Sequence, residues 1–262
     1  MDPAKINPEL KEGIAKGWER PEHIRLRIQP AIHDSEYPVL GDLNEFIKRH
    51  GTTDKIRILD FGAGASPYKI YFPNADYRRA DIIKTPGLDY EIDANSRIDE
   101  ESETFDLIIS TQVLEHVENT RAYLAESLRL LKKSGKLLVT THGIWEEHGV
   151  PYDFQRWTEA GMMRDLKAVG FDGITIFKTT CGLRAGTFFF IKTLFAAKPP
   201  DRQPGRLFFK IFRTSISKIF PFIYRLSDKF WPEERIEQVT TNSPSSAFYA
   251  IIAATARKPN ES

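Results

Sequence analysis

An acidic residue and two glycines follow a short apolar run near residue 60. The run Ile56–Leu59 has the β-branched and apolar composition of a buried strand. Asp60 comes next, followed by Gly62 and Gly64. Glycine lets the chain turn tightly and lets the backbone approach a ligand closely. The spacing therefore predicts a strand-to-helix turn that holds a small ligand, with the free N–H groups of the helix pointing at it.

Two nucleoside cofactors could use this turn. A dinucleotide site has the pattern Gly-x-Gly-x-x-Gly, which requires a third glycine where this chain has Pro67. A site for S-adenosylmethionine carries an acidic residue two positions before the first glycine, because it must hold an ammonium group, and Asp60 is there. Asp81 ends the predicted strand Asp76–Asp81, about twenty residues after the turn, where a carboxylate can bond two ribose hydroxyls. Asp81 thus supports a nucleoside ligand without choosing between the two.

The segment from His142 to Thr158 is rich in side chains that do acid–base chemistry or bind polar ligands. It contains two histidines, an aspartate, an arginine, a tyrosine and two tryptophans. Histidine titrates near neutral pH and can take the proton of a hydroxyl acceptor. We expect His142 or His148 to be this base, with Asp153 orienting one of them or binding sugar hydroxyls. The alternative is a packed lid in which His142 bonds a backbone carbonyl. The six-residue spacing of the histidines matches no familiar metal motif, so no metal site is predicted.

Strands and helices alternate from about residue 55 onward. This pattern predicts an α/β fold with a parallel sheet and crossover helices. Ligands of such sheets bind beyond the carboxyl ends of the strands, which brings the predicted turns after several strands to one site. The later strands are predicted at residues 88–93, 105–110, 136–141, 171–179 and 247–256.

The sequence around these strands resembles a known enzyme family. Asp60-x-Gly62-x-Gly64 resembles the first motif of class I S-adenosylmethionine-dependent methyltransferases, with Ser66 where a third glycine is usual. The stretch from Ile92 to Val117 closely resembles the type 11 group of that class.

The resemblance implies roles for individual residues. Asp93 is expected to accept a hydrogen bond from the adenine amino group, and the backbone amide of Ala94 to read the ring. From its place at a helix start, His116 is expected to pack or to cap the helix, and Glu115 is expected to be solvated or to cap. Neither of the two is expected to act as a catalyst. The cofactor residues predicted in all are Asp60, Gly62, Gly64, Asp81, Ile82, Asp93, Ala94 and Thr111.

The resemblance also implies a fold and a class of acceptor. It predicts a Rossmann-like, mostly parallel seven-stranded sheet with helices on both faces and an antiparallel last strand. Residues 110–113 lack the Asn/Asp-Pro-Pro-aromatic motif of enzymes that methylate the amines of nucleic-acid bases. The loop 142–158 looks like those of methyltransferases from polysaccharide and lipid-linked glycan pathways.

Three regions are predicted along the chain. Residues 1–54 form an N-terminal helical cap, which either helps to cover the substrate or only packs on the core. Residues 55–182 and 244–258 form the cofactor-binding core, and residues 183–243 form a basic, aromatic, amphipathic insertion. Within that insertion we expect a helix over 206–220 that Pro221 kinks or ends.

The insertion differs in charge from the rest of the chain. Residues 183–231 hold ten Lys or Arg residues against two acids, a net charge of +8, whereas the whole chain carries +1. A basic amphipathic helix with many aromatic residues is typical of a membrane-surface contact. The alternative is a lid whose apolar face packs over the active site.

Composition bounds the remaining possibilities. The 262 residues, 41% hydrophobic and 28% charged, are typical of a soluble globular chain, and nucleic acid is not an expected partner. The single cysteine, Cys181, fits a reducing compartment. No signal peptide or membrane-spanning run is recognised, so we expect a cytoplasmic protein that can lie at the inner membrane face.

These observations predict an S-adenosylmethionine-dependent methyltransferase that methylates an oxygen of a glycan or lipid-linked small molecule. Two alternatives remain open on the sequence. One is an NAD(P)-dependent oxidoreductase, against which Pro67 argues. The other is a membrane-associated module that binds the cofactor without catalysis.

Overall fold

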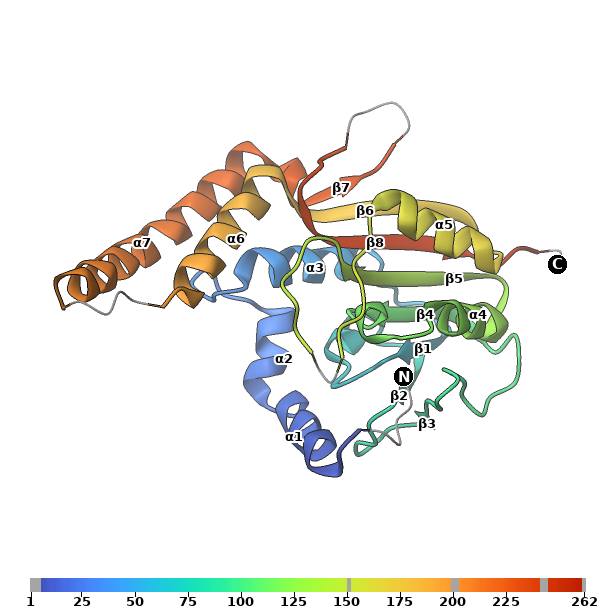
Figure 1. Ribbon diagram of the computed structural model, residues 1–262. Helices are drawn as coiled ribbons and strands as arrows, with labels where there is room; N and C mark the ends of the chain where they lie inside the picture. The colour runs from blue at the N-terminus through green and yellow to red at the C-terminus, as the bar shows by residue number, and fades with distance from the viewer. Residues whose placement is uncertain (1–5, 150–151, 199–202, 241–244, 261–262) are drawn as a thin grey trace.

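An eight-stranded sheet forms the centre of the protein. The computed structural model describes residues 6–149, 152–198, 203–240 and 245–260 (Figure 1). The strand order is β3-β2-β1-β4-β5-β8-β6-β7. Strands β1 to β5 pair in parallel, and β8 lies antiparallel between β5 and β6. The strands are β1 (Arg57–Phe61), β2 (Asp76–Asp81), β3 (Tyr90–Glu91), β4 (Phe105–Thr111), β5 (Leu131–His142), β6 (Asp172–Cys181), β7 (Ile236–Gln238) and β8 (Tyr249–Arg257).

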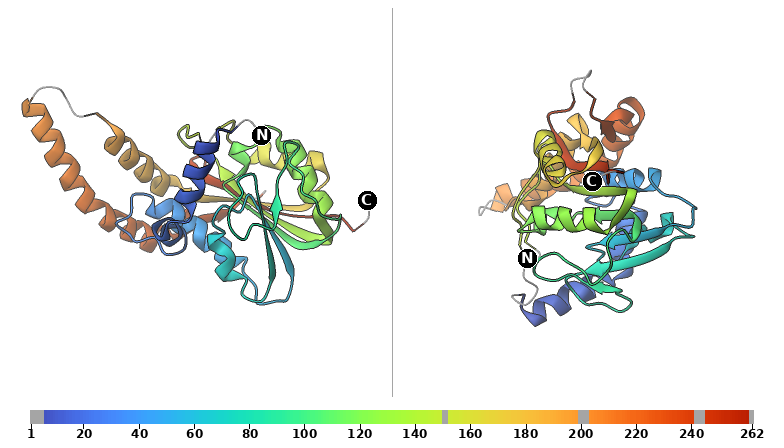
Figure 2. Two further views of the ribbon diagram at one scale, coloured as in Figure 1. Left: turned by 90° about the horizontal axis from the view of Figure 1, so that it is seen from below. Right: turned by 90° about the vertical axis from the view of Figure 1, so that its right-hand side faces the viewer.

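Helices cover both faces of this sheet (Figure 2). One face packs against α4 and α5, and the other packs against α3 and α6. Neighbouring residues Ile58 and Leu59 of β1 are fully buried in the two different cores, as the alternation of a strand requires. Burying one such side chain contributes about 1.5–3 kcal/mol relative to leaving it exposed. The helices are α1 (Pro8–Trp18), α2 (Pro21–Ile28), α3 (Tyr37–Arg49), α4 (Thr120–Leu130), α5 (Glu159–Val169), α6 (Gly182–Ala196) and α7 (Gln203–Phe230), with 3-10 turns η2 (Pro67–Tyr71), η3 (Leu114–His116) and η4 (Pro232–Glu234).

The predicted Rossmann-like fold and the antiparallel C-terminal strand are confirmed, but the predicted strand count is wrong. The described chain has eight strands rather than seven. The additional strand is β7, which pairs antiparallel with the open edge of β6. Its three residues are too few to show a periodic pattern, and they come from the segment that returns to the sheet after α7.

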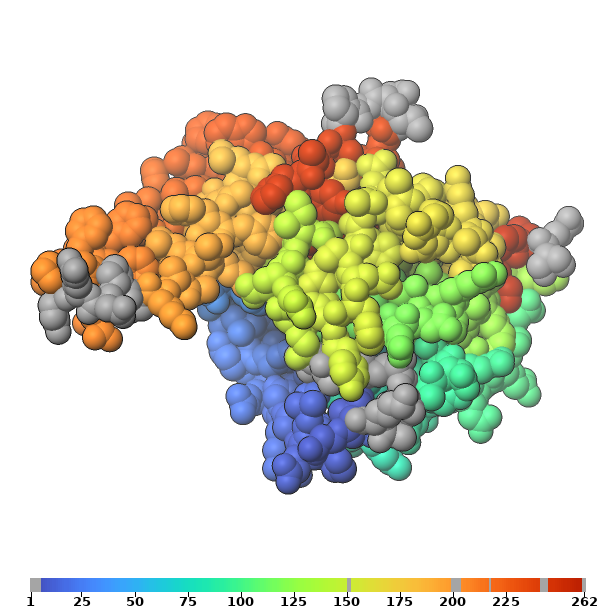
Figure 3. Space-filling model, in the orientation of Figure 1, coloured from blue at the N-terminus to red at the C-terminus, as the bar shows by residue number. Residues whose placement is uncertain are grey.

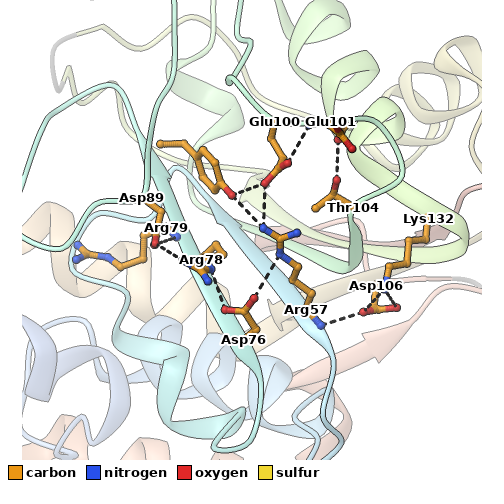
Figure 4. A network of polar contacts seen from close by, with 11 residues as sticks. Arg57, Asp76, Arg78, Arg79, Asp89, Glu100, Glu101, Thr104, Asp106 and Lys132 are labelled. Carbon is orange, nitrogen blue, oxygen red and sulfur yellow. Dashed lines mark hydrogen bonds and ion pairs between the residues drawn. The ribbon is translucent and has the colours of Figure 1, made fainter.

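A polar network joins the amino ends of β1, β2 and β4 (Figure 4). The guanidinium of Arg57 lies 3.0 Å from the carboxylate of Glu100 and 3.4 Å from that of Asp76. The backbone N–H of Arg57 donates to Asp106, which also pairs with Lys132. These contacts fix the register of the strands at their amino ends. Ligands of such sheets bind at the other end, beyond the carboxyl ends of the strands.

Helices α6 and α7 form a hairpin that projects from the body of the protein (Figures 1 and 2). Pro221 lies inside α7 and does not end it, contrary to one of the two predicted outcomes. A proline removes only one backbone donor, and here the neighbouring Phe220 and Tyr224 are buried against Ile191 of α6. No described helix is long and apolar enough to cross a bilayer.

Candidate active site

A first hollow opens at the carboxyl ends of β1, β2 and β4. It has an apolar wall and two carboxylates, and Trp18 at the end of α1 closes one side. The residues that line it are Trp18, Gly62, Asp81, Ile82, Ile83, Ile92, Asp93, Ser96, Gln112, Val113, His116, Val117 and Tyr123. Four of the predicted cofactor residues therefore lie on its wall: Gly62, Asp81, Ile82 and Asp93.

The glycine turn lies at the edge of this hollow in a conformation that requires glycine. Gly62 has a φ of +80°, and a Cβ at this position would lie 2.5 Å from the side chain of Val113. The predicted helix does not follow the turn, because η2 is only a short 3-10 helix. Instead, the guanidinium of Arg79 donates to the carbonyl of Gly64 and to the hydroxyl of Ser66. Sequence reasoning missed Arg79, whose side chain reaches the turn only once β1 and β2 pair.

Asp60 lies behind the turn rather than on the wall of the hollow. Its buried carboxylate accepts a 2.8 Å hydrogen bond from the hydroxyl of Tyr77. Burial raises the pKa of Asp60 to about 7. The predicted contact of this carboxylate with an ammonium group stays a prediction.

Asp81 ends β2 with its carboxylate held against the glycine turn. One oxygen accepts a hydrogen bond from the backbone N–H of Gly64 at 2.8 Å, and the other accepts one from Ile83 at 3.0 Å. Burial raises the pKa of this carboxyl above its ordinary value. Each oxygen keeps a further lone pair, so the group can still accept hydrogen bonds from two ligand hydroxyls.

Asp93 shapes the far side of the hollow. Its carboxylate accepts hydrogen bonds from the backbone N–H groups of Asn95 and Arg97, both at 2.8 Å, which fixes a tight turn after β3. The neighbouring Ala94 is exposed, and Thr111 is the half-buried last residue of β4. Neither of these two predicted residues is among those that line the hollow.

A second hollow adjoins the first and is lined by the predicted catalytic histidines. The two hollows share Trp18, Gln112 and His116. His142 and His148 line only the second hollow, together with Glu115 and Trp145. The segment that carries the histidines runs down the face of the protein toward α1 (Figure 3).

His142 ends β5 in a buried position. Its ring stacks on Trp145 with 4.5 Å between centroids, and its Nε2 lies 3.2 Å from the Oε1 of Glu115. Within the described ranges its Nδ1 has no hydrogen-bond partner, so the expected alternative of a bond to a backbone carbonyl is not observed there. Burial lowers the pKa of His142 to about 2, which keeps the imidazole neutral.

Glu115 is fully buried, contrary to the prediction of a solvated or capping residue. Its Oε2 accepts a 2.7 Å hydrogen bond from the hydroxyl of Thr141, and burial raises the pKa of the carboxyl. The adjacent His116 lies with its Nδ1 2.6 Å from the carbonyl oxygen of Tyr152. Both residues come from the connection after β4, and only the parallel pairing of β4 and β5 brings them to His142.

His148 and Asp153 lie together. The Nδ1 of His148 is 3.3 Å from the carboxylate of Asp153, and the backbone N–H of His148 donates to the same carboxylate at 2.8 Å. Arg156 donates two hydrogen bonds to Asp153 and holds the pKa of that carboxyl well below its usual range. Asp153 is thus placed to orient His148, but it is not among the residues that line the second hollow.

Gln112 was not predicted and lies where the two hollows meet. It is a non-glycine residue with a φ of +56°. Its amide nitrogen donates to the hydroxyl of Thr140 at 3.1 Å, and its Oε1 is buried without a hydrogen-bond partner. Backbone strain of this kind concentrates at functional sites. The only signal in the sequence was its place directly after a strand of the parallel sheet.

Comparison with known proteins agrees with this geometry. A family model described as "Methyltransferase domain" matches residues 32–170, a little over half of the chain. No curated protein is significantly similar in sequence.

Several solved structures share the fold at low identity. An S-adenosylmethionine-dependent methyltransferase from Thermotoga maritima has a TM-score of 0.53 and 14% identity, over 95% of this chain and 98% of that one. A chain from the complex between the Haloferax volcanii Trm112 methyltransferase activator and a methyltransferase has a TM-score of 0.52 and 12% identity. The match covers 97% of this chain and 100% of that one. Phosphoethanolamine N-methyltransferase 2 of Haemonchus contortus, solved with S-adenosyl-L-methionine, has a TM-score of 0.49 and 15% identity over 97% of this chain. The chain spans only 61% of that enzyme's length.

The family match decides between the interpretations that the glycine turn left open. The matched residues include the glycine turn and all the residues predicted to bind the cofactor or to act in catalysis. They also include Pro67, which stands where a dinucleotide site has its third glycine. The oxidoreductase and the non-catalytic module receive no support. The chain belongs to the methyltransferase domain family.

Proposed function

We propose that this protein transfers a methyl group to a hydroxyl oxygen of a glycan or lipid-linked small molecule. The observation that carries the proposal is the junction of the two hollows at Trp18, Gln112 and His116. The first hollow takes the cofactor, and the second takes the acceptor, so that the reacting atoms meet at this junction. Holding two reactants in this way is the main demand of a methyl transfer.

The residues of the first hollow fit the cofactor. Asp81 accepts hydrogen bonds from the ribose hydroxyls, and Asp93 with the amide of Ala94 binds the adenine edge. Apolar side chains such as Ile82 pack against the base, and Gly62 and Gly64 let the backbone come close. Asp60 and Thr111 are not among the residues that line the hollow, and their contacts with the cofactor stay predictions.

The residues of the second hollow activate the acceptor. S-adenosylmethionine, when bound in the first hollow, would supply an electrophilic sulfonium methyl group and would leave as the neutral thioether, and the proton of the acceptor hydroxyl would pass to an imidazole of the second hollow. The imidazoles of His142 and His148 accept the hydrogen bond of that hydroxyl, and Asp153 orients His148. The surrounding Trp145 and Trp18 keep water away from the junction.

A third hollow supports an acceptor with an apolar tail. It lies between the α6–α7 hairpin and the loop before α3, and it is lined by Ile191, Phe195, Phe220 and Tyr224 among others. It shares Glu36 and Lys192 with the second hollow. A lipid-linked acceptor can therefore place its polar head beside the histidines and its apolar part against the hairpin.

The exposed face of the hairpin supports contact with an anionic membrane surface. Phe208 is 70% exposed and Leu207 is 61% exposed, although large apolar side chains are normally buried. The other exposed apolar residues of α7 are Ile211, Phe212, Ile219, Phe222 and Phe230. Basic residues are interleaved with them along the same helix. Each basic residue contributes about 1 kcal/mol to the free energy of membrane binding when it lies beside an anionic leaflet. We place the protein at the inner face of the cytoplasmic membrane.

The proposal is tested by offering the protein methyl-labelled S-adenosylmethionine and separate acceptor pools. The pools are lipid-linked glycans extracted from membranes, water-soluble sugar nucleotides, and no acceptor. We expect S-adenosylhomocysteine release and a labelled product with the lipid-linked pool, with the methyl group resistant to mild alkali as an ether is. A label found on nitrogen or as an alkali-labile ester would refute transfer to a hydroxyl.

A further inference from the structure

Four buried polar atoms that make no hydrogen bond within the described part of the chain gather in the second hollow, although Glu115 Oε1 lies 3.2 Å from His142 Nε2 and His148 Nδ1 lies 3.3 Å from Asp153. They are Gln112 Oε1, Glu115 Oε1, His142 Nδ1 and His148 Nδ1. Leaving one such atom unpaired in a protein interior costs about 1–3 kcal/mol. Gln112 Oε1 and His142 Nδ1 have no hydrogen-bond partner among the described residues, and the other two atoms have only longer contacts, so the hollow can offer bonds to a ligand.

The geometry of three of these side chains fits a single metal ion. One ligand atom from each of Glu115, His142 and His148 lies within 4.8 Å of the other two. Three ligand atoms evenly spaced around one cation at about 2.0–2.2 Å lie at most about 3.8 Å apart, so separations near 4.8 Å would shorten when an ion binds.

The charges of the site also favour a cation. Glu115 is fully buried, and the described residues give its Oε1 no Lys or Arg within ion-pair distance. A buried carboxylate is stable only when it is paired or binds a metal.

The surrounding contacts orient the candidate ligands as outer-shell residues do in metal sites. The hydroxyl of Thr141 fixes the second oxygen of Glu115, and Asp153 fixes the backbone of His148. His116 directs its Nε2 toward the same carboxylate, 4.0 Å from Glu115 Oε1, because its Nδ1 contacts a backbone carbonyl.

We propose that Glu115, His142 and His148 bind one divalent transition-metal cation beside the methyl-transfer site. Two imidazoles and one carboxylate suit Zn²⁺, Mn²⁺, Fe²⁺, Co²⁺ or Ni²⁺ better than Mg²⁺ or Ca²⁺, and they leave open positions toward the hollow. The sequence predicted no metal because the histidine spacing matches no motif, and it could not show that Glu115 joins the two histidines.

The cation would explain how the acceptor is activated, a consequence that rests on the proposed function. A hydroxyl oxygen bound to the cation loses its proton to solvent more easily, because the metal stabilises the alkoxide. The histidines and Asp153 then act on the hydroxyl through the metal that they hold. Metal binding itself does not depend on which acceptor is methylated.

Direct titration tests the site without any acceptor. Chelator-treated protein is titrated by calorimetry with Zn²⁺, Mn²⁺ and Co²⁺, and its thermal unfolding is followed with and without each ion. We expect one equivalent to bind, with a higher Tm. In Glu115→Gln and His148→Ala the affinity should fall at least about tenfold, as loss of a ligand implies. His50→Ala, which removes a histidine outside the second hollow, should bind as the wild type does.

The outcomes separate this inference from the proposed function. Equal affinity in His148→Ala, Glu115→Gln and wild type, or no binding at all, overturns the metal site even if methyl transfer to a hydroxyl is found. Tight, Glu115-dependent binding with no methyl transfer to a hydroxyl supports the metal site and removes the proposed function. Because the His148 side chain is partly exposed, His148→Ala remains informative if Glu115→Gln does not fold.

Discussion

The guanidinium of Arg184 in α6 lies 2.7 Å from the carboxylate of Asp42 in α3, and neither side chain is exposed. Arg184 also pairs with Asp228 of α7 at 2.7 Å, and Arg235 pairs with Asp42 at 2.8 Å. This buried network joins the helical hairpin to the cap and the sheet. Breaking a buried ion pair by removing one partner typically costs about 3–5 kcal/mol, because a charge is left uncompensated.

The first prediction concerns this network. Asp42→Ala should lower the free energy of unfolding by about 3–5 kcal/mol in urea titration, because Arg184 and Arg235 both lose their contact with this buried carboxylate. Glu45→Ala is the matched control, because it breaks the exposed pair with Arg49 on the same helix and should cost less than about 1 kcal/mol. Equal losses in the two variants would show that the network does not anchor the hairpin.

The second prediction concerns the glycine turn. In Gly62→Ala, the new Cβ would lie 2.5 Å from Val113 in a left-handed backbone conformation, so the turn must move and cofactor affinity should fall at least about tenfold. Calorimetry with S-adenosylhomocysteine measures this. Gly13→Ala, whose Cβ would meet nothing within 4 Å in α1, should leave affinity unchanged. Wild-type affinity in Gly62→Ala would place the cofactor away from this turn.

The sequence predicted the sheet well because its signals are local. The predicted bounds of β2 match the observed Asp76–Asp81 residue for residue, and the glycine turn and Asp81 lie on one hollow as expected. The buried contacts of charged residues were missed, because they depend on partners far away in the chain. Arg184 meets Asp42 across 142 positions, and Glu115 meets Thr141 across 26. A buried Glu115 cannot be told from a solvated one until β4 and β5 are paired.

The third prediction concerns pH. The carboxyl of Asp60 has a pKa of 3.8 when unperturbed and about 7 in the folded protein, because it is buried. The folded state therefore keeps a proton that the unfolded chain releases, so this group lowers stability progressively as pH rises from about 4 to about 7. In Asp60→Asn, the stability relative to wild type should rise over that window and stay level above it. Urea unfolding of both proteins without cofactor measures this, and a difference independent of pH would contradict the buried state of Asp60.

The fourth prediction concerns the membrane. Phe208→Ser combined with Ile211→Ser removes two exposed apolar side chains, so folding should be unaffected while sedimentation with anionic vesicles falls at least about tenfold. Ile70→Ser, at an equally exposed position in η2, is the control and should sediment as the wild type does. Unchanged sedimentation of the double variant would remove the hairpin as the membrane contact.

The central claim is that the first hollow binds S-adenosylmethionine, and calorimetric titration tests it most directly. The ligands are S-adenosylmethionine, S-adenosylhomocysteine and NAD, offered to wild type, to Asp81→Ala and to Asp76→Ala at the other end of the same strand. We predict that both adenosyl ligands bind to wild type and to Asp76→Ala, and that Asp81→Ala loses at least about tenfold in affinity because the ribose hydroxyls lose their acceptor. Tight binding of NAD with no response to S-adenosylhomocysteine, or full affinity in Asp81→Ala, would contradict this assignment of the site.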